Sequence, residues 1–272
     1  SLEIVSHKRL PPGGIKFLPN LRYLLDPKNT DLYRTEFITK LADIADVYIN
    51  CAFGCSHRVT KSIKLLPQMM RQKGKLVVAG VLLYEEINRI GKFAGRILSQ
   101  PKKTLVVTGG AKISDKIEVL KQFVLTGVKS ILIGGKMANA FLLAQQQKEL
   151  IQPFHTDKLP AKLLSQKVQE NEELLKEINL AEEIIELAEI NKVALIFPDD
   201  YKVVSDYQST IFENKVTPDF SKELQLDLGE KTINQFEDLF KDIKNVFWNG
   251  PLGAYDHPAC SYYAEGSLEL AK

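Results

Sequence analysis

The sequence predicts an α/β protein with parallel sheets in three α/β/α layers, divided into two lobes. Short apolar runs recur along the 272 residues and alternate with amphipathic segments. These runs are continuously apolar, which is typical of strands buried on both faces of a parallel sheet. With 44% hydrophobic residues, a chain of this length can bury a large core, and two lobes suit it better than one.

Six apolar runs are predicted as buried strands: residues 46–49, 76–78, 105–107, 131–133, 193–197 and 246–248. Helical patterns separate them. In residues 172–190 the apolar positions recur every three or four residues, and acidic residues fill the other face. Residues 36–45 and 117–124 follow the same pattern more briefly. This alternation of strands and helices indicates a doubly wound arrangement.

A boundary between the lobes is expected near residue 95. Residues 84–98 are predicted as one helix, which Gly91 and Gly95 weaken, and residues 99–103 then break the pattern. We therefore expect one lobe in residues 1–95 and another in residues 96–272. The two glycines make this helix a candidate hinge, although an ordinary long helix also tolerates a few glycines.

Composition and charge exclude several functional classes. The net charge is only +2, from 36 basic and 34 acidic residues, so nothing demands a nucleic acid or a membrane surface as partner. No apolar run reaches the ~18 residues of a membrane span, and no signal peptide is recognisable. Cys51, Cys55 and Cys260 form no paired framework, so reduced thiols in a cytoplasmic protein are expected and a zinc site is not.

The segment TLVVTGGAKISDK, residues 104–116, suggests a phosphate-binding turn. A strand at 104–108 ends in Gly109 and Gly110, and a helix is expected over 114–126. Glycines allow backbone N–H groups to approach an anion, and a helix N-terminus adds a positive field. Lys112 and Lys116 lie four residues apart, so both ammonium groups could face a polyphosphate. From these thirteen residues alone, two solvated lysines on a polar helix start are the slightly favoured interpretation.

Two further turns are predicted at the same edge of the sheet. Gly134 and Gly135 follow the strand at 131–133, and Asn249 and Pro251 follow the strand at 246–248. The carboxyl ends of parallel strands are the usual ligand position in such sheets. Asp256, further along this last segment, could accept hydrogen bonds from ribose hydroxyls. Each turn alone could be ordinary, but three at one edge favour a binding crevice.

The first lobe has a basic cluster of its own. His57 and Arg58 follow the strand at 46–49, and Arg22 follows another apolar run at 15–18. Two arginines and a histidine at strand ends would suit a doubly charged phosphate and a carboxylate. A single histidine is more often structural than functional.

Several motifs, taken together and in this order, resemble phosphoglycerate kinase. They cover nearly the whole chain and read FLPNLR, VYINCAFGCSHR, AGVLLYEE, TGGAKISDKI, IGGKMANAFL, FPDD, DLGEKT and VFWNGPLGAYD. The resemblance implies two Rossmann-like lobes joined by a helix, with a hinge that closes them for phosphoryl transfer. It implies 3-phosphoglycerate or 1,3-bisphosphoglycerate on the first lobe, ADP or ATP with Mg²⁺ on the second, and a cytoplasmic monomer of glycolysis or gluconeogenesis.

The resemblance also assigns roles to residues. Arg22 and Arg58 match arginines of the substrate patch, with His57 beside them, and Arg22 is also a candidate catalytic residue. Lys112 matches the catalytic lysine that moves onto the transferring phosphoryl group. Phosphoryl transfer depends on positioning and on positive charge at the equatorial oxygens, which agrees with these cations.

The remaining assignments concern the nucleotide. Lys116 matches a lysine on its phosphates, and Gly109 and Gly110 form the turn beside it. The adenine pocket and ribose contacts are assigned to Gly134, Gly135, Asn249, Pro251 and Asp256, the last standing where the family usually has Glu.

The chain departs from the family pattern at Cys51, Thr60 and Lys136, which replace an Asp, a commonly basic or amide residue and a third glycine. The family's first strand and its late metal-holding loop have no counterpart, so the sequence resembles the middle of the enzyme, with an incomplete first lobe and no metal ligand within it. Little kinase activity is expected from these residues alone. A short, non-catalytic nucleotide-binding paralogue and a structural protein that retains the fold are the alternatives.

Overall fold

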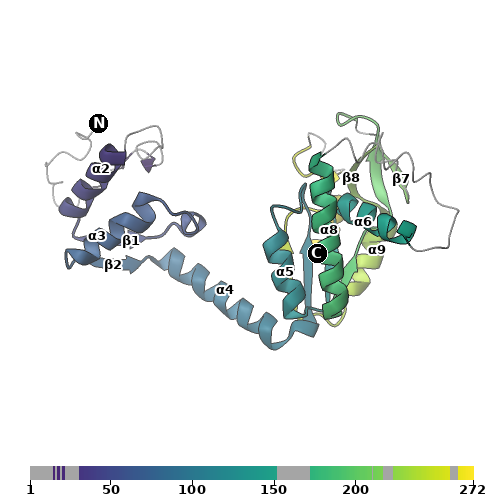
Figure 1. Ribbon diagram of the computed structural model, residues 1–272, viewed down its shortest axis with the longest axis horizontal. Helices are drawn as coiled ribbons and strands as arrows, with labels where there is room; N and C mark the ends of the chain where they lie inside the picture. The colour runs from purple at the N-terminus through teal and green to yellow at the C-terminus, as the bar shows by residue number, and fades with distance from the viewer. Residues whose placement is uncertain are drawn as a thin grey trace. The chain divides into compact units, whose positions relative to one another are not determined.

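The computed structural model describes residues 15, 17–18, 20–21, 31–151, 172–209, 211–216, 223–257 and 263–272. The chain divides into two compact units, Ser1–Lys92 and Phe93–Lys272. The division falls within helix α4, Val81–Ser99 (Figure 1). The predicted helix at 84–98 is therefore present, extended at both ends. Each unit is described by itself below.

The first unit pairs two short parallel strands with two helices. Strand β1 (Val47–Asn50) runs parallel to β2 (Leu76–Ala79). Helices α2 (Asp31–Ile44) and α3 (Leu66–Gln72) pack together around a small core formed by Phe37, Ile38, Ala42, Leu66 and Met70. Two single turns, η2 (Phe53–Cys55) and η3 (Lys61–Leu65), connect β1 to α3. The two predicted strands and the helix are confirmed.

The prediction of a strand at the apolar run 15–18, before Arg22, was wrong. Its described residues, Ile15, Phe17 and Leu18, lie in no strand, and the side chains of Ile15 and Phe17 are 83% and 92% exposed. An apolar run becomes a strand only where a neighbouring strand accepts its backbone hydrogen bonds, and the sequence pattern alone carries no information about that neighbour.

The second unit is built on a four-stranded parallel sheet in the order β5-β4-β3-β9. These strands are β3 (Thr104–Thr108), β4 (Ser130–Ile133), β5 (Ala194–Ile196) and β9 (Asn245–Asn249). All four were predicted. Because Thr108 is opposite both Ile133 and Asn249, the central strands β4, β3 and β9 end at the same level.

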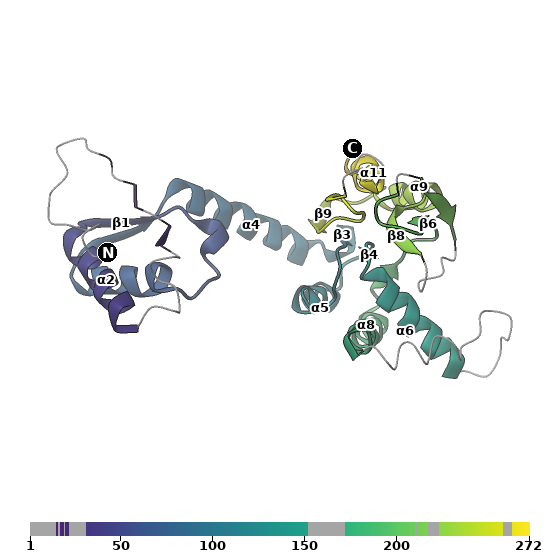
Figure 2. The same ribbon diagram turned by 90° about the horizontal axis from the view of Figure 1, so that it is seen from above.

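Helices cover both faces of this sheet. Helices α5 (Ile117–Thr126), α6 (Ala138–Ile151) and α8 (Glu172–Asn191) lie on one side, and α9 (Glu230–Leu239) and α11 (Glu265–Ala271) on the other (Figure 2). Alternate residues of the strands face the two layers. Val106, Ile131 and Ile133 join the core under α5, α6 and α8, whereas Leu105, Val107 and Leu132 join the core under α9 and α11. The three-layer α/β/α arrangement is confirmed for this unit.

A third, antiparallel sheet of order β7-β6-β8 was not predicted. It consists of β6 (Tyr201–Val204), β7 (Glu213–Lys215) and β8 (Leu224–Leu228). The buried strand β6 contains Lys202, a residue type that normally argues against a buried strand. The lysine is accommodated by an ion pair with Glu265 and by the ring of Phe212, whose centroid is 4.9 Å from Nζ.

Candidate functional site

The three predicted glycine turns meet at the carboxyl edge of the parallel sheet. The N–H of Gly109 donates to Asn249 O at 3.2 Å, and the N–H of Gly134 donates to Thr108 O at 2.8 Å. The N–H of Gly135 donates to Leu252 O at 3.1 Å. These bonds link the ends of β3, β4 and β9 directly, so the turns form one continuous backbone surface.

Close backbone contacts explain why glycine occupies these turns. A Cβ atom on Gly109 would lie 2.0 Å from Pro251 O, and one on Gly135 would lie 2.6 Å from Gly110 N. Gly110, Gly135 and Gly250 also have positive φ angles of 115°, 64° and 93°. Side chains would therefore force the three turns apart.

Lys116 lies beside this junction. It is the N-cap residue of α5, and its Nζ donates to Asn249 O at 2.7 Å and to Asn249 Oδ1 at 3.1 Å. Burial lowers the pKa of Lys116, while the charge of Asp115 opposes that shift. An ammonium group has three N–H donors, so the third can be donated to an anion at the turns.

The Lys112 side chain has a different partner from the Lys116 side chain. The predicted helix start at 114 was wrong, because α5 begins at Ile117 and both lysines precede it. Lys112 instead forms an ion pair with Glu173 on α8. This hydrogen bond raises the pKa of Lys112 and lowers the pKa of Glu173. The helical spacing expected to align the two ammonium groups is therefore absent.

A second carboxylate of α8 holds the same loop. Glu177 accepts hydrogen bonds from the N–H of Ile113 at 2.5 Å and from the Ser114 hydroxyl at 2.7 Å. The amphipathic pattern predicts an acidic face on this helix but names no partner for it, so these contacts were missed. The spacing of Glu173 and Glu177, one helical turn apart, was the available signal.

The other nucleotide candidates lie on the segment after β9. The carbonyl of Pro251 faces Gly109 closely, since a Cβ atom on that glycine would lie 2.0 Å from the carbonyl oxygen. Asp256 is exposed on the turn that follows. Its ribose role stays a prediction.

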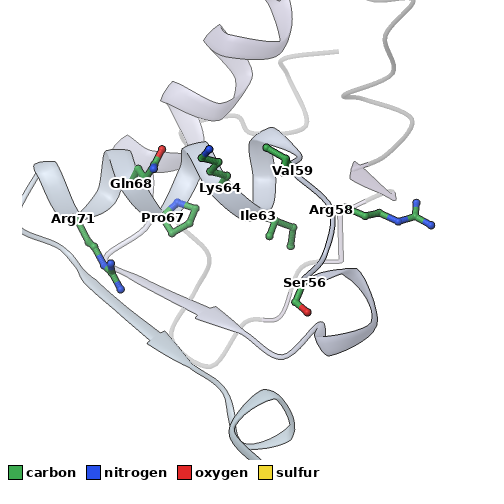
Figure 3. A pocket seen from close by; sticks show the side chains of 8 residues that line it. All are labelled: Ser56, Arg58, Val59, Ile63, Lys64, Pro67, Gln68 and Arg71. Atoms are coloured by element: carbon green, nitrogen blue, oxygen red, sulfur yellow. The ribbon is translucent and has the colours of Figure 1, made fainter. Parts of the chain in front are cut away.

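In the first unit, His57 and Arg58 are exposed in the turn after η2. Arg58 lines a pocket of about 360 Å³ together with Ser56, Val59, Ile63, Lys64, Pro67, Gln68 and Arg71. The charged lining residues are all cations, but the Arg58 side chain points away from the others (Figure 3). Arg22 and Cys260 lie outside the described residues. Cys51 and Cys55 are free and exposed.

A buried hydrogen-bond network joins the FPDD and DLGEKT motifs. The Asp200 side chain accepts hydrogen bonds from Thr232 N at 2.8 Å and Thr232 Oγ1 at 2.6 Å, at the start of α9. Asp227 accepts from Gly266 N at 2.9 Å, and its Oδ1 is buried without a hydrogen-bond partner. Both motifs contribute to the family resemblance, but no role was predicted for these carboxylates.

Asp227 should make stability depend on pH. Burial raises the pKa of its carboxyl above the ordinary 3.8, although the N–H groups of Gly266 and Leu228 and the charge of Lys202 oppose this. At pH values between the ordinary pKa and the raised pKa, the folded state therefore holds a proton that the unfolded chain has released. The free energy of unfolding should fall as pH rises from about 4 through the raised pKa. The non-titrating variant Asp227→Asn should gain stability relative to the wild type over that range.

Urea unfolding at several pH values measures this difference. A gap between the wild type and Asp227→Asn that is constant with pH would contradict the shifted titration.

Metal-binding and membrane-spanning features are absent from the described residues. They contain no group of three or more His, Cys, Asp or Glu side chains arranged to hold a metal ion. Within the same part of the chain, no helix combines the length and apolar composition needed to cross a membrane.

The fold and the converging turns define an α/β protein of the open parallel-sheet class, with its candidate site at the carboxyl ends of the strands. The family described as phosphoglycerate kinase matches residues 3–272. The chain belongs to this family.

Individual relatives agree with this assignment. The chain is 36% identical to phosphoglycerate kinase of Lactobacillus johnsonii over 85% of its own length and 50% of the relative. It is 32% identical to that of Bdellovibrio bacteriovorus, over 97% and 58%. The solved phosphoglycerate kinase of Coxiella burnetii is similar with a TM-score of 0.60 and 25% identity, over 87% of this chain and 55% of that one. The chain thus spans about half the length of these relatives.

Proposed function

We propose that this chain serves reversible phosphoryl transfer between 1,3-bisphosphoglycerate and ADP, giving 3-phosphoglycerate and ATP. Its membership of the phosphoglycerate kinase family supports this reaction. In the proposal, residues 96–272 bind the nucleotide and residues 1–95 contribute to binding the phosphoglycerate through Arg22, His57 and Arg58.

One observation carries the nucleotide part of the proposal. Three glycine turns meet at one sheet edge, and the ammonium group of Lys116 lies at their junction. The N–H groups of Gly109, Gly134 and Gly135 are already donated to backbone carbonyls, so these glycines contribute a close approach of the backbone to a ligand. The positive charge comes from the partly buried ammonium group of Lys116. We assign the phosphates of ADP or ATP to Gly109, Gly110 and Lys116.

The remaining assignments follow the resemblance to the phosphoglycerate kinase family. The adenine pocket is assigned to Gly134, Gly135, Asn249 and Pro251. Asp256 accepts hydrogen bonds from the ribose. Lys112 supplies positive charge to the transferring phosphoryl group, where charge stabilisation matters most.

Mg²⁺ would arrive with the nucleotide. Mg²⁺ in nucleotide sites is held largely by the phosphates and water, with one or two carboxylates, so it needs no cluster of protein ligands.

Calorimetry with ADP and Mg²⁺ tests the nucleotide site. We expect measurable binding that Lys116→Met weakens about tenfold or more, because a hydrogen bond from a charged group contributes about 1.5–3 kcal/mol. Lys121→Met is the matched control: Lys121 lies in α5, five residues after Lys116, and pairs with Glu183 at 2.6 Å. Equal affinities for the two variants would contradict the assignment of Lys116.

A coupled assay with 3-phosphoglycerate then separates catalysis from binding. Nucleotide binding without turnover is the result expected of these residues alone, and it also fits a non-catalytic member of the family. Turnover at the rate of an ordinary kinase would contradict that expectation and the non-catalytic alternative. Absence of both activities would favour a structural role.

A further inference from the structure

Two carboxylates of α8 hold the loop that carries Lys112. Glu173 pairs with the Lys112 side chain, and Glu177, one helical turn later, binds the backbone of the next two residues, Ile113 and Ser114. Residues four apart on a helix lie on the same face, so both carboxylates face this loop.

The two contacts differ in strength. Glu177 accepts three hydrogen bonds: from Ile113 N at 2.5 Å, from Ser114 N at 3.3 Å and from Ser114 Oγ at 2.7 Å. Ile113 is itself fully buried, so this part of the loop is fixed. The side chains of Lys112 and Glu173 are 50% and 68% exposed, and ion pairs between such exposed groups contribute little free energy.

Glu173 lies near further positive charges, while Asp115 and Glu177 also act on Lys112. Besides Lys112, the charge of Lys136 lowers the pKa of Glu173, and Lys176 contributes as well. Lys136 is exposed at the turn that follows Gly135. A phosphate group carries more negative charge and more acceptor oxygens than one carboxylate, so it can compete for these lysines.

We propose that Glu173 is a placeholder anion for a phosphate group, and that Glu177 is the positioning residue that keeps the loop in place while the two exchange. In the ligand-free protein Glu173 holds Lys112, and an arriving phosphate displaces it. This inference rests on the proposed nucleotide site, and it gives Lys136, a departure from the family pattern, a role in attracting the phosphate.

The test compares three variants of the full chain, Glu173→Gln, Glu177→Gln and Glu183→Gln. Glu183 is the matched control, since it is also on α8 and pairs with a lysine of α5 away from the turns. Calorimetry uses two probes, ATP with Mg²⁺ and inorganic triphosphate, since ATP carries the phosphoryl group assigned to Lys112. Glu173→Gln should bind both up to about fivefold more tightly, the factor that an exposed ion pair represents. Glu183→Gln should bind like the wild type.

Glu177→Gln should act in the opposite direction. With the loop loosened, binding should weaken, and the amide protons of Ile113 and Ser114 should exchange with solvent about tenfold faster or more. The same amides should stay protected in Glu173→Gln. A purely structural role for both carboxylates would instead weaken binding in both variants, which would overturn the placeholder role.

The two probes separate this inference from the proposed function. If only inorganic triphosphate binds and Glu173→Gln tightens it, the nucleotide proposal fails and the placeholder role stands. If ATP binds but Glu173→Gln and Glu183→Gln bind it equally, the placeholder role fails alone. Binding of neither probe, by the wild type or by Glu173→Gln, overturns both.

Discussion

Gly135→Ala should destabilise the second unit by about 2–5 kcal/mol and weaken ADP binding strongly. Gly135 has a φ angle of 64°, where a side chain costs about 1–2 kcal/mol. The added Cβ would also lie 2.6 Å from Gly110 N and 2.8 Å from Gly110 O. These are backbone atoms, which cannot rotate away, and such overpacking costs about 1–3 kcal/mol more.

Gly127→Ala separates the two contributions. Gly127 ends α5 with a φ angle of 71°, but a Cβ atom added there would meet no heavy atom within 4 Å. This variant should lose only the backbone contribution, about 1–2 kcal/mol, and should bind ADP normally. Urea unfolding and calorimetry measure both quantities. If the two variants are equally destabilised, the close contact between Gly135 and Gly110 has no energetic importance.

Much of the fold could be predicted from local patterns. The strands of the parallel sheet are continuous apolar runs because helices cover both faces, as at 131–133, and the long helix α8 follows from its periodicity. Strand β6 could not be predicted in this way. Its Lys202 is tolerated only because Glu265 and Phe212, distant in sequence, surround it.

The candidate site was predictable to a similar degree. Glycine turns at the ends of parallel strands must meet at one edge, so the junction of Gly109, Gly135 and Asn249 follows from the order of elements. The direction of a lysine side chain does not. Lys112 was expected beside Lys116, but it turns to Glu173 because a carboxylate 61 positions away in the sequence lies within reach.

Asp200→Ala should destabilise the second unit by about 1–3 kcal/mol. Asp200 is 7% exposed, and its carboxylate accepts hydrogen bonds from Thr232 N, Thr232 Oγ1 and Lys231 N at the start of α9. Removing it leaves buried donors in the first turn of α9 unpaired, and this loss contributes about 1–3 kcal/mol.

The consequence should extend from α9 to the candidate site. Phe236 of α9 shares a buried cluster with Leu252, whose carbonyl accepts the hydrogen bond from Gly135. Asp200→Ala should therefore weaken ADP binding as well as lower the urea midpoint. Asp199→Ala is the matched control, because its neighbouring carboxylate forms only an exposed ion pair with Lys231 at 3.1 Å, worth about 0–1 kcal/mol. Equal midpoints for the two variants would show that α9 forms without the Asp200 carboxylate, and the proposed route from α9 through Leu252 to Gly135 would then have no support.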